Sequence, residues 1–199
     1  VLLCEELLAV DGCADGGKDG GGYFEAGWGK VMNIDIICPL YNAEHYLKFL
    51  HQSLLMQENV EIHSIKYALT RSTDRTEKML RELEAEYTLV EPKEFSHSAT
   101  RELMAKQCNG DIIVFISQDV KIQRPDWLFN LTKDIAEGNC EAAYSRQLSE
   151  KDNIEKYTRE KNYGDLSFIK TKADIDRLGL NTFFFSDASS AIKRSVFSE

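Results

Sequence analysis

The sequence has no long apolar run, no surplus of positive charge and no paired cysteine motif, and each absence excludes a class of protein. Its apolar runs reach only about five residues, whereas a helix that crosses a membrane needs about 20. A formal net charge of −9 argues against a nucleic-acid partner, because nucleic-acid surfaces attract clustered Lys and Arg. We therefore expect a cytoplasmic chain with no membrane span, which reaches a membrane only through partners.

Cysteine is scattered along the chain, at Cys4, Cys13, Cys38, Cys108 and Cys140. Without a Cys-x-x-Cys pair, neither a disulfide framework nor a zinc site is indicated. Reduced thiols in a cytosolic protein are the simplest interpretation. The composition, 43% apolar and 29% charged over 199 residues, is typical of a soluble globular domain with a sizeable core.

Glycine, by contrast, is concentrated at one end of the chain. Eight of the 12 glycines precede Lys30. Glycine at this density argues against regular structure. We expect residues 1–31 to be an appendage, native or not, that is either flexible or docked, and residues 32–199 to form the folded domain.

Within the appendage, Gly12-x4-Gly17-Lys18 follows the pattern of a phosphate-binding loop up to its last position, where Asp19 replaces the expected Ser or Thr. That position needs a hydroxyl group for magnesium, and a carboxylate there would face the phosphates. A solvated Gly-rich linker is therefore the favoured interpretation. A nucleotidase built on this loop is the weaker alternative.

From residue 34 onward, short apolar runs alternate with amphipathic segments. The apolar runs predict strands at residues 34–38, 61–69, 87–91, 111–117 and 141–145. The segments between them predict helices at residues 42–54, 72–83, 98–108 and 125–138. The charged stretch up to Arg177 is expected to be irregular, and residues 181–197 read as a strand, a turn and the start of a helix.

Local signals predict where several of these elements begin and end. Pro39 should end the first strand, and Asn42 should cap the first helix. Asp74 and Glu77 have the spacing of a capping box for the second helix. Gly110 fits the C-terminal position of the third helix.

Alternating strands and helices predict an α/β fold with a mostly parallel central sheet and helices on both faces. In such a sheet, ligands bind beyond the carboxyl ends of the strands. Asp119 follows the run "DIIVFIS", which is too apolar to be anything but a central strand. We therefore expect Asp119 at the binding edge.

Five segments, taken in order, carry a family resemblance: "CPLYNAEHYL", "RSTDRT", "FSHSATRELMAKQCNGDIIVFISQDV", "AAYSRQL" and "FFFSDASSAIKRSVF". They resemble motifs of inverting family-two glycosyltransferases with the GT-A fold, a Rossmann-like nucleotide-diphospho-sugar transferase fold. The third segment is closest to rhamnosyltransferase-like members. The resemblance runs from about residue 34 to about residue 197, and residues 1–31 lie outside it.

The resemblance implies a glycosyltransferase that takes a sugar, with rhamnose as a candidate, from a dTDP- or UDP-linked donor. The implied acceptor is a glycan or lipid-linked glycan in surface polysaccharide synthesis. Asp119 matches the last Asp of the family's metal-binding motif, which implies a Mg²⁺ or Mn²⁺ cofactor. Ser117 stands where the first carboxylate of that motif is expected, so one carboxylate would hold the ion with water and phosphate oxygens.

The resemblance also implies a set of nucleotide-binding positions: Pro39, Tyr41, Asn42, Thr70, Arg71, Ser72, His97, Arg101 and Gln118. Simpler roles stand beside the functional ones. Asn42 and Tyr41 could serve as helix cap and packing residue, and Arg101 could form a surface ion pair with an acid. Leu69 occupies a position that is acidic in most members and helps to read the base, so the identity of the base stays open.

The family's usual catalytic base is a carboxylate in a Gly-Glu-Asp-like segment beyond the last matched motif, and this sequence does not contain it. Asp187 is the late carboxylate that lies in a matching motif, and it is our candidate base here. We expect a chain that binds donor and is poorly active or inactive alone. The alternative is a non-catalytic nucleotide-binding or scaffolding module of the same fold.

Overall fold

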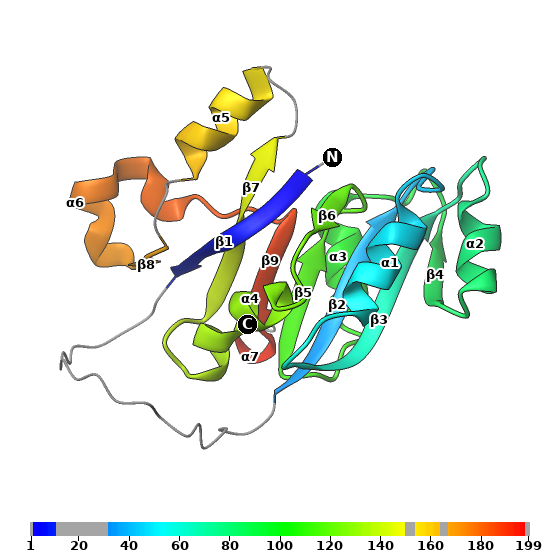
Figure 1. Cartoon of the computed structure of the whole chain (residues 1–199), viewed down its shortest axis with the longest axis horizontal. Helices are drawn as coiled ribbons and strands as arrows, with labels where there is room; N and C mark the ends of the chain where they lie inside the picture. The colour runs from blue at the N-terminus through cyan, green and yellow to red at the C-terminus, as the bar shows by residue number, and fades with distance from the viewer. Residues whose placement is uncertain (1, 11–31, 150–153, 164–166, 198–199) are drawn as a thin grey trace.

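The structure, a computed structural model, describes residues 2–10, 32–149, 154–163 and 167–197 (Figure 1). Its strands are β1 (Leu2–Val10), β2 (Asn33–Leu40), β3 (Glu61–Thr70), β4 (Glu86–Val90), β5 (Ile112–Ile116), β6 (Val120–Ile122), β7 (Ala142–Ser149), β8 (Ile169–Lys170) and β9 (Ser189–Lys193). Its helices are α1 (Leu47–Leu55), α2 (Thr76–Glu82), α3 (His97–Ala105), α4 (Trp127–Ala136), α5 (Ile154–Asn162), α6 (Ile175–Leu178) and α7 (Arg194–Phe197). Two 3-10 turns lie at Lys172–Asp174 and Gly179–Phe183.

The strands form one mixed sheet in the order β4-β3-β2-β5-β9-β7-β1-β6, and β8 pairs with β1. Strands β4, β3, β2 and β5 are parallel. Strand β9 runs antiparallel to both of its neighbours, β5 and β7. The predicted α/β class with a mostly parallel sheet is confirmed: four of the five predicted strands, β2 to β5, are parallel, and the fifth, β7, is antiparallel to its neighbours.

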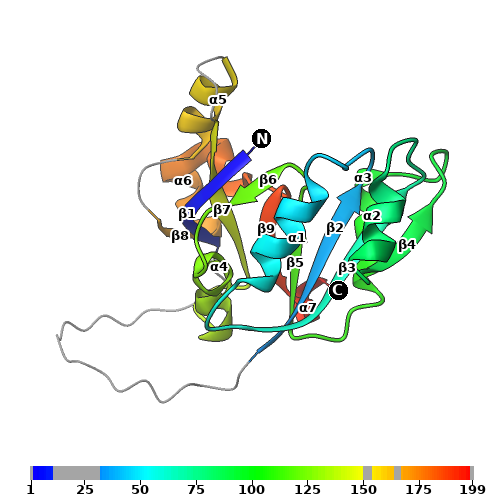
Figure 2. The ribbon, with the colours of Figure 1, turned by 45° about the vertical axis from the view of Figure 1, so that its right-hand side comes forward.

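Each face of the sheet has its own hydrophobic core, and alternate residues of β5 supply both. Ile112, Val114 and Ile116 belong to the core that includes α1 and α4, while Ile113 and Phe115 belong to the core that includes α3. Figures 1 and 2 show α1 on the near face of the sheet. A strand buried on both faces has no room for polar alternation, which explains the uniformly apolar sequence of β5.

Part of the predicted appendage forms a strand of the sheet. Strand β1 pairs antiparallel with β7, from Leu2 opposite Ser149 to Val10 opposite Ala142, and it also pairs with β6 and β8 (Figure 1). The phosphate-loop pattern at residues 12–18 lies outside the described residues.

The first two predicted helix caps are wrong. Helix α1 begins at Leu47, after a turn, and Asn42 adopts a positive φ of 47° instead of capping it. Helix α2 begins at Thr76, and Asp74 accepts a hydrogen bond from the Thr76 N–H without a capping box. In both cases the polar side chain is used to join loops to one another.

Gly110 is not the end of the third helix either, because α3 ends at Ala105. A Cβ atom on Gly110 would lie 2.7 Å from the Asn33 carbonyl oxygen. Gly110 is therefore required by the close approach of the turn before β5 to strand β2, and its N–H donates to Asp35 at 2.6 Å.

Three further expectations about element boundaries need correction. Pro39 lies inside β2, opposite Ala68 of β3, where β2 has no β5 partner because that pairing ends at Ile37. The charged stretch up to Arg177 contains α5, β8 and α6. In residues 181–197 the strand follows the turn, because the segment begins in a 3-10 turn and β9 comes later.

Among the described helices, none has both the length and the apolar character that crossing a membrane requires.

The carboxylate of Asp35 joins β2 to its two neighbours. Asp35 is fully buried and accepts hydrogen bonds from the Ser64 hydroxyl group at 2.5 Å, the Asn109 N–H at 2.8 Å and the Gly110 N–H. Its partners belong to β3 and to the turn that starts β5. One side chain thus fixes the relative heights of three parallel strands.

We predict that Asp35→Ala lowers the free energy of unfolding by about 3 kcal/mol, because it leaves buried donors without an acceptor. Chemical denaturation measures the change. The matched control is Asp176→Ala at an exposed carboxylate of α6, which should change stability by no more than about 0.5 kcal/mol. Equal effects of the two substitutions would contradict the role assigned to Asp35.

Candidate functional site

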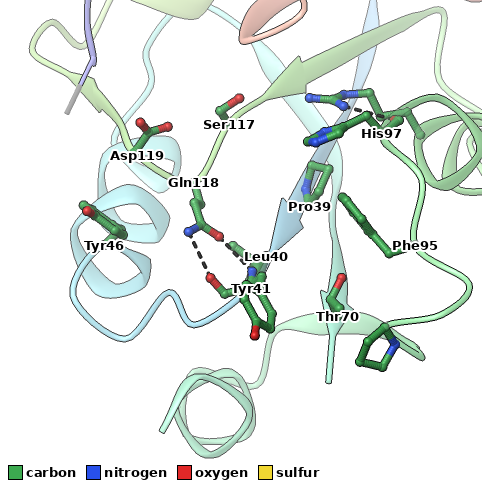
Figure 3. Close-up of a pocket in the computed structure, with 12 residues that line it drawn as sticks. Pro39, Leu40, Tyr41, Tyr46, Thr70, Phe95, His97, Ser117, Gln118 and Asp119 are labelled. Carbon is green, nitrogen blue, oxygen red and sulfur yellow. Dashed lines mark hydrogen bonds between the residues drawn. The ribbon is translucent and has the colours of Figure 1, made fainter. Parts of the chain in front are cut away.

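The loops that follow β2, β4 and β5 meet the end of β3 at one edge of the sheet and surround a cavity of about 620 Å³. Seven of the predicted positions line this cleft: Pro39, Tyr41, Thr70, His97, Arg101, Gln118 and Asp119. Asp119 and Tyr46 lie on one side of it, and Thr70 and Phe95 lie on the other (Figure 3). Residues that are up to 80 positions apart (39 and 119) are therefore brought together by parallel strands that end at the same edge.

Gln118 ties the loop after β5 to the loop after β2. The Tyr41 N–H donates to Gln118 Oε1 at 2.8 Å, and Gln118 Nε2 donates to the Tyr41 carbonyl oxygen at 3.1 Å (Figure 3). This pair of bonds leaves the Tyr41 side chain 54% exposed at the mouth of the cleft. A large exposed aromatic ring held by its backbone is a suitable surface for a flat ligand group.

Asn42 and Ser72 brace the cleft and do not line it. The Ser72 hydroxyl group accepts from the Asn42 N–H at 3.0 Å, and Asn42 Oδ1 accepts from the Thr73 N–H at 3.0 Å. Together these bonds join the loop after β2 to the loop after β3. The two residues therefore set the shape of the cleft without facing a ligand.

Asp74 makes the second connection between these loops. Its carboxylate accepts from the Glu44 N–H at 3.0 Å, the Thr76 N–H at 3.0 Å and the Thr76 hydroxyl group at 2.6 Å. Burial alone would raise the pKa of Asp74, but the hydrogen bonds from Thr76 and Glu44 outweigh it and hold the pKa below its ordinary value.

Arg71 lies outside the cleft. Its guanidinium group makes a bidentate contact with the exposed carboxylate of Glu91, with Nη2 2.6 Å from Oε1 and Nε 3.2 Å from Oε2. Hydrogen bonding to Glu91 raises the pKa of Arg71 and lowers that of Glu91. The contact fastens β3 to the residue after β4 at the edge of the sheet.

Arg101 is the cation of the cleft, and it is 9% exposed. Its Nη1 donates to the His97 carbonyl oxygen at 3.0 Å, and its Nη2 lies 3.3 Å from Asp187 Oδ2. Within the described part of the chain, Arg101 Nε is buried without a hydrogen-bond acceptor. The His97 ring packs edge-on against Phe95, with ring centroids 5.0 Å apart, and both residues line the same cleft as Arg101.

The segment that carries Asp187 is held in place from the rest of the sheet. Lys170 is buried and donates to the Asn181 carbonyl oxygen at 3.0 Å, and burial lowers the pKa of this lysine. Gln147 Nε2 donates to the Ser186 hydroxyl group at 2.6 Å. Asp187 itself is 67% exposed, so its carboxylate reaches solvent from a fixed backbone.

Asp119 supplies the carboxylate of the cleft, two residues after Ser117. The Ser117 N–H donates to the Ala188 carbonyl oxygen at 2.8 Å, which anchors the loop. Among the described residues, no group of three or more His, Cys, Asp or Glu side chains is placed to hold a metal ion. A cation here would therefore meet one carboxylate and a hydroxyl group, and oxygen ligands of this kind suit Mg²⁺ or Mn²⁺.

Thr70 and Leu69, at the end of β3, differ in what they offer a ligand. Thr70 lines the cleft, and its buried Oγ1 has no hydrogen-bond partner among the described residues. Leu69 is fully buried in the hydrophobic core. The position at which the family resemblance leads us to expect an acidic residue therefore does not reach the cleft, and Thr70 is the polar group of β3 that does.

Sequence reasoning missed four of the other lining residues: Leu40, Tyr46, Pro92 and Phe95. Tyr46 falls within the helix predicted at residues 42–54, whereas it precedes α1. Phe95 lies two positions before His97 in a quoted motif, and this spacing was the available signal. Pro92 and Leu40 carried no signal of their own.

The strands and helices form the GT-A fold, which two solved structures share. Glucosyl-3-phosphoglycerate synthase of M. tuberculosis matches with a TM-score of 0.55 at 16% identity, over 83% of this chain and 58% of that chain. Mannosyltransferase PcManGT from Pyrobaculum calidifontis, solved with GDP-Man and Mn²⁺, matches with a TM-score of 0.56 at 19% identity, over 84% of this chain and 46% of that chain. Likeness at this level of identity establishes the fold.

The chain belongs to glycosyl transferase family 2, whose sequence model matches residues 35–199. O-antigen chain rhamnosyltransferase RfbN of Salmonella typhimurium is 31% identical over 172 residues, which are 84% of this chain and 54% of that protein. O-antigen chain rhamnosyltransferase WbaN of Salmonella anatum is 30% identical over 176 residues, with the same two shares. The chain thus spans about half the length of these curated relatives.

We predict that Asp74→Asn makes the protein less stable at neutral pH and less sensitive to acid. The ordinary pKa of this group is 3.8 and the folded value is lower, so its stabilisation is present above pH 3.8 and is lost as the pH falls through the folded value. Denaturation midpoints from about pH 7 to about pH 3 should therefore converge for the variant and the parent protein. Asp176→Asn is the control, and parallel curves for Asp74→Asn would contradict the assignment.

Proposed function

We propose that this chain is the donor-binding domain of a metal-dependent, inverting glycosyltransferase. It binds a UDP- or dTDP-linked sugar, with rhamnose as the first candidate, for transfer to a glycan or lipid-linked acceptor in surface polysaccharide synthesis. The observation that carries the proposal is the convergence of Tyr41, Thr70, Arg101 and Asp119 on one cleft. Family membership and similarity to proteins named O-antigen chain rhamnosyltransferases support it.

The nucleoside is assigned to the part of the cleft between β2 and β3. Tyr41 offers an exposed ring against which a base can stack, and Pro39 lies beside it in the lining. The unpartnered hydroxyl group of Thr70 is placed to bond to the base or the ribose. Because Leu69 offers no hydrogen bond, the base is read without a carboxylate at that position.

The diphosphate is assigned to the part of the cleft between α3 and the loop after β5. Arg101 can direct its two terminal nitrogens at phosphate oxygens in a bidentate contact, with His97 beside it. The carboxylate of Asp119 and the hydroxyl group of Ser117 would hold a divalent cation on the opposite side. When bound, that cation supplies positive charge against the departing diphosphate.

Transfer forms a bond between the acceptor hydroxyl oxygen and the anomeric carbon, while the bond from that carbon to the phosphate oxygen breaks. The electron pair of the broken bond leaves with the nucleoside diphosphate, and the hydroxyl proton passes to a base. Attack from the side opposite the leaving group inverts the anomeric carbon. Asp187 is our candidate base, because its exposed carboxylate lies beside Arg101 at the margin of the cleft.

We predict that Mn²⁺ strengthens the binding of UDP or dTDP to this chain by about tenfold and that Asp119→Asn removes this enhancement. The amide has nearly the same shape as the carboxylate but carries no charge for the ion. Calorimetric titration with and without Mn²⁺ measures the effect, with Asp176→Asn as the control. The absence of nucleotide binding, or an unchanged response to Mn²⁺ in Asp119→Asn, would sink the proposal.

A second substitution separates positioning from metal binding. Gln118→Ala removes both hydrogen bonds to the Tyr41 backbone, so it should weaken nucleotide binding about fivefold whether or not Mn²⁺ is present. Gln107→Ala, at an exposed amide near the end of α3, is the matched control. If Gln118→Ala acted only in the presence of Mn²⁺, the tether would not be what holds the nucleoside part of the cleft.

A further inference from the structure

A second cavity, of about 670 Å³, lies on the α3 face of the sheet. It is enclosed by α3, by β5 and β9, by the segment that carries Asp187 and by α7. Arg101 lines both this cavity and the first cleft, and Asp187 contacts Arg101 from the second side. The two cavities therefore adjoin at one ion pair.

Two polar atoms in the lining of this cavity are buried without a hydrogen-bond partner in the described part of the chain. They are Ser190 Oγ, in a fully buried residue of β9, and Arg101 Nε. Ser189, the preceding residue, is also fully buried, but its hydroxyl group donates to Ser145 at 2.9 Å. Buried polar atoms are nearly always satisfied in folded proteins, so the two unpartnered atoms indicate a ligand that supplies hydrogen bonds.

The charges around the cavity are already compensated. Lys106 Nζ lies 2.6 Å from Glu102 Oε1, and Arg101 is paired with Asp187. An ionic ligand would have to displace one of these pairs. A neutral ligand with hydroxyl groups can form hydrogen bonds with Ser190 Oγ and Arg101 Nε without displacing either ion pair.

Apart from Ser98, the rest of the lining is apolar and aromatic. The ring centroids of Phe115 and Phe197 lie 5.5 Å apart. Phe185, which is 37% exposed, lines the same cavity. A sugar ring has an apolar C–H face and a rim of hydroxyl groups, so it matches a wall of aromatic rings with a few polar atoms between them.

We propose that this second cavity binds a sugar unit of the glycan acceptor, with Ser190 as a ligand-binding residue. The inference rests on the proposed function, because it assigns an acceptor to the transferase whose donor occupies the first cleft. A sugar here has its hydroxyl groups next to Asp187, the candidate base, at the junction of the two cavities. Donor and acceptor would then approach each other from opposite sides of Arg101.

The test uses the ¹⁵N-labelled chain and two neutral probes, methyl α-D-galactopyranoside and methyl α-D-glucopyranoside. We expect at least one of them to shift the amide signals of Ser190 and Ile192 in a saturable way while the signal of Thr70 stays in place. Shifts from neither glycoside would overturn the inference and leave the cavity as a surface on which protein packs.

A matched pair of substitutions on β9 sharpens the test. Ser190→Ala should weaken glycoside binding about fivefold, as expected for one lost hydrogen bond, and raise the thermal midpoint because it removes an unsatisfied buried hydroxyl group. Ser189→Ala should lower the thermal midpoint and leave glycoside affinity unchanged, because its hydroxyl group is bonded to Ser145. Equal glycoside affinity in the two variants would contradict the role of Ser190.

Nucleotide titration of the same samples distinguishes this inference from the proposed function. Binding of UDP with Mn²⁺ but of neither glycoside would refute the acceptor cavity and leave the donor cleft intact. Glycoside binding at Ser190 without nucleotide binding would refute the transferase assignment, and with it the description of the bound sugar as an acceptor.

Discussion

The cleft depends on the relative height of β2 and β5. Asp35 sets that height, because its buried carboxylate holds the turn from which β5 starts. With Ile37 opposite Phe115, the two strands end nearly level, and Tyr41 and Gln118 emerge close enough to exchange two hydrogen bonds. A structural carboxylate at one end of the strands thus determines the geometry at the other end, where the loops that line the cleft lie.

Opposite charges on the two sides of one cavity are the chemical feature that this geometry produces. Asp119 and Arg101 both line the cleft. No cluster of like charges precedes either residue in the sequence, so the local sequence alone does not identify either one as a binding residue. A sugar nucleotide with a divalent cation carries both signs of charge along its length, which is why we propose such a ligand for the cleft and not a simple anion. The net charge of −9 does not oppose it, because binding depends on the local pair.

The sequence allowed the parallel strands β2 to β5 and most of the cleft to be predicted, because buried parallel strands are apolar and their loops converge. The errors concern residues whose partners are distant. Asn42 has the local signature of a helix cap, but its side chain bonds to Thr73, which is 31 positions away. Gly110 has the signature of a helix end, but its role is set by Asn33 across the sheet. Local patterns contain no information about such contacts.

The reversed direction of β9 has a consequence for how the protein can change over time. Because β9 begins where β5 ends, the residues just before it arrive at the ligand-binding edge, where the Ala188 carbonyl oxygen receives the Ser117 N–H. Insertions or deletions in the turns around α6 can be absorbed at the periphery. An insertion or deletion between Ser186 and Ser189 would displace the loop that carries Asp119. We therefore expect this short segment to tolerate changes of length less than other segments during evolution.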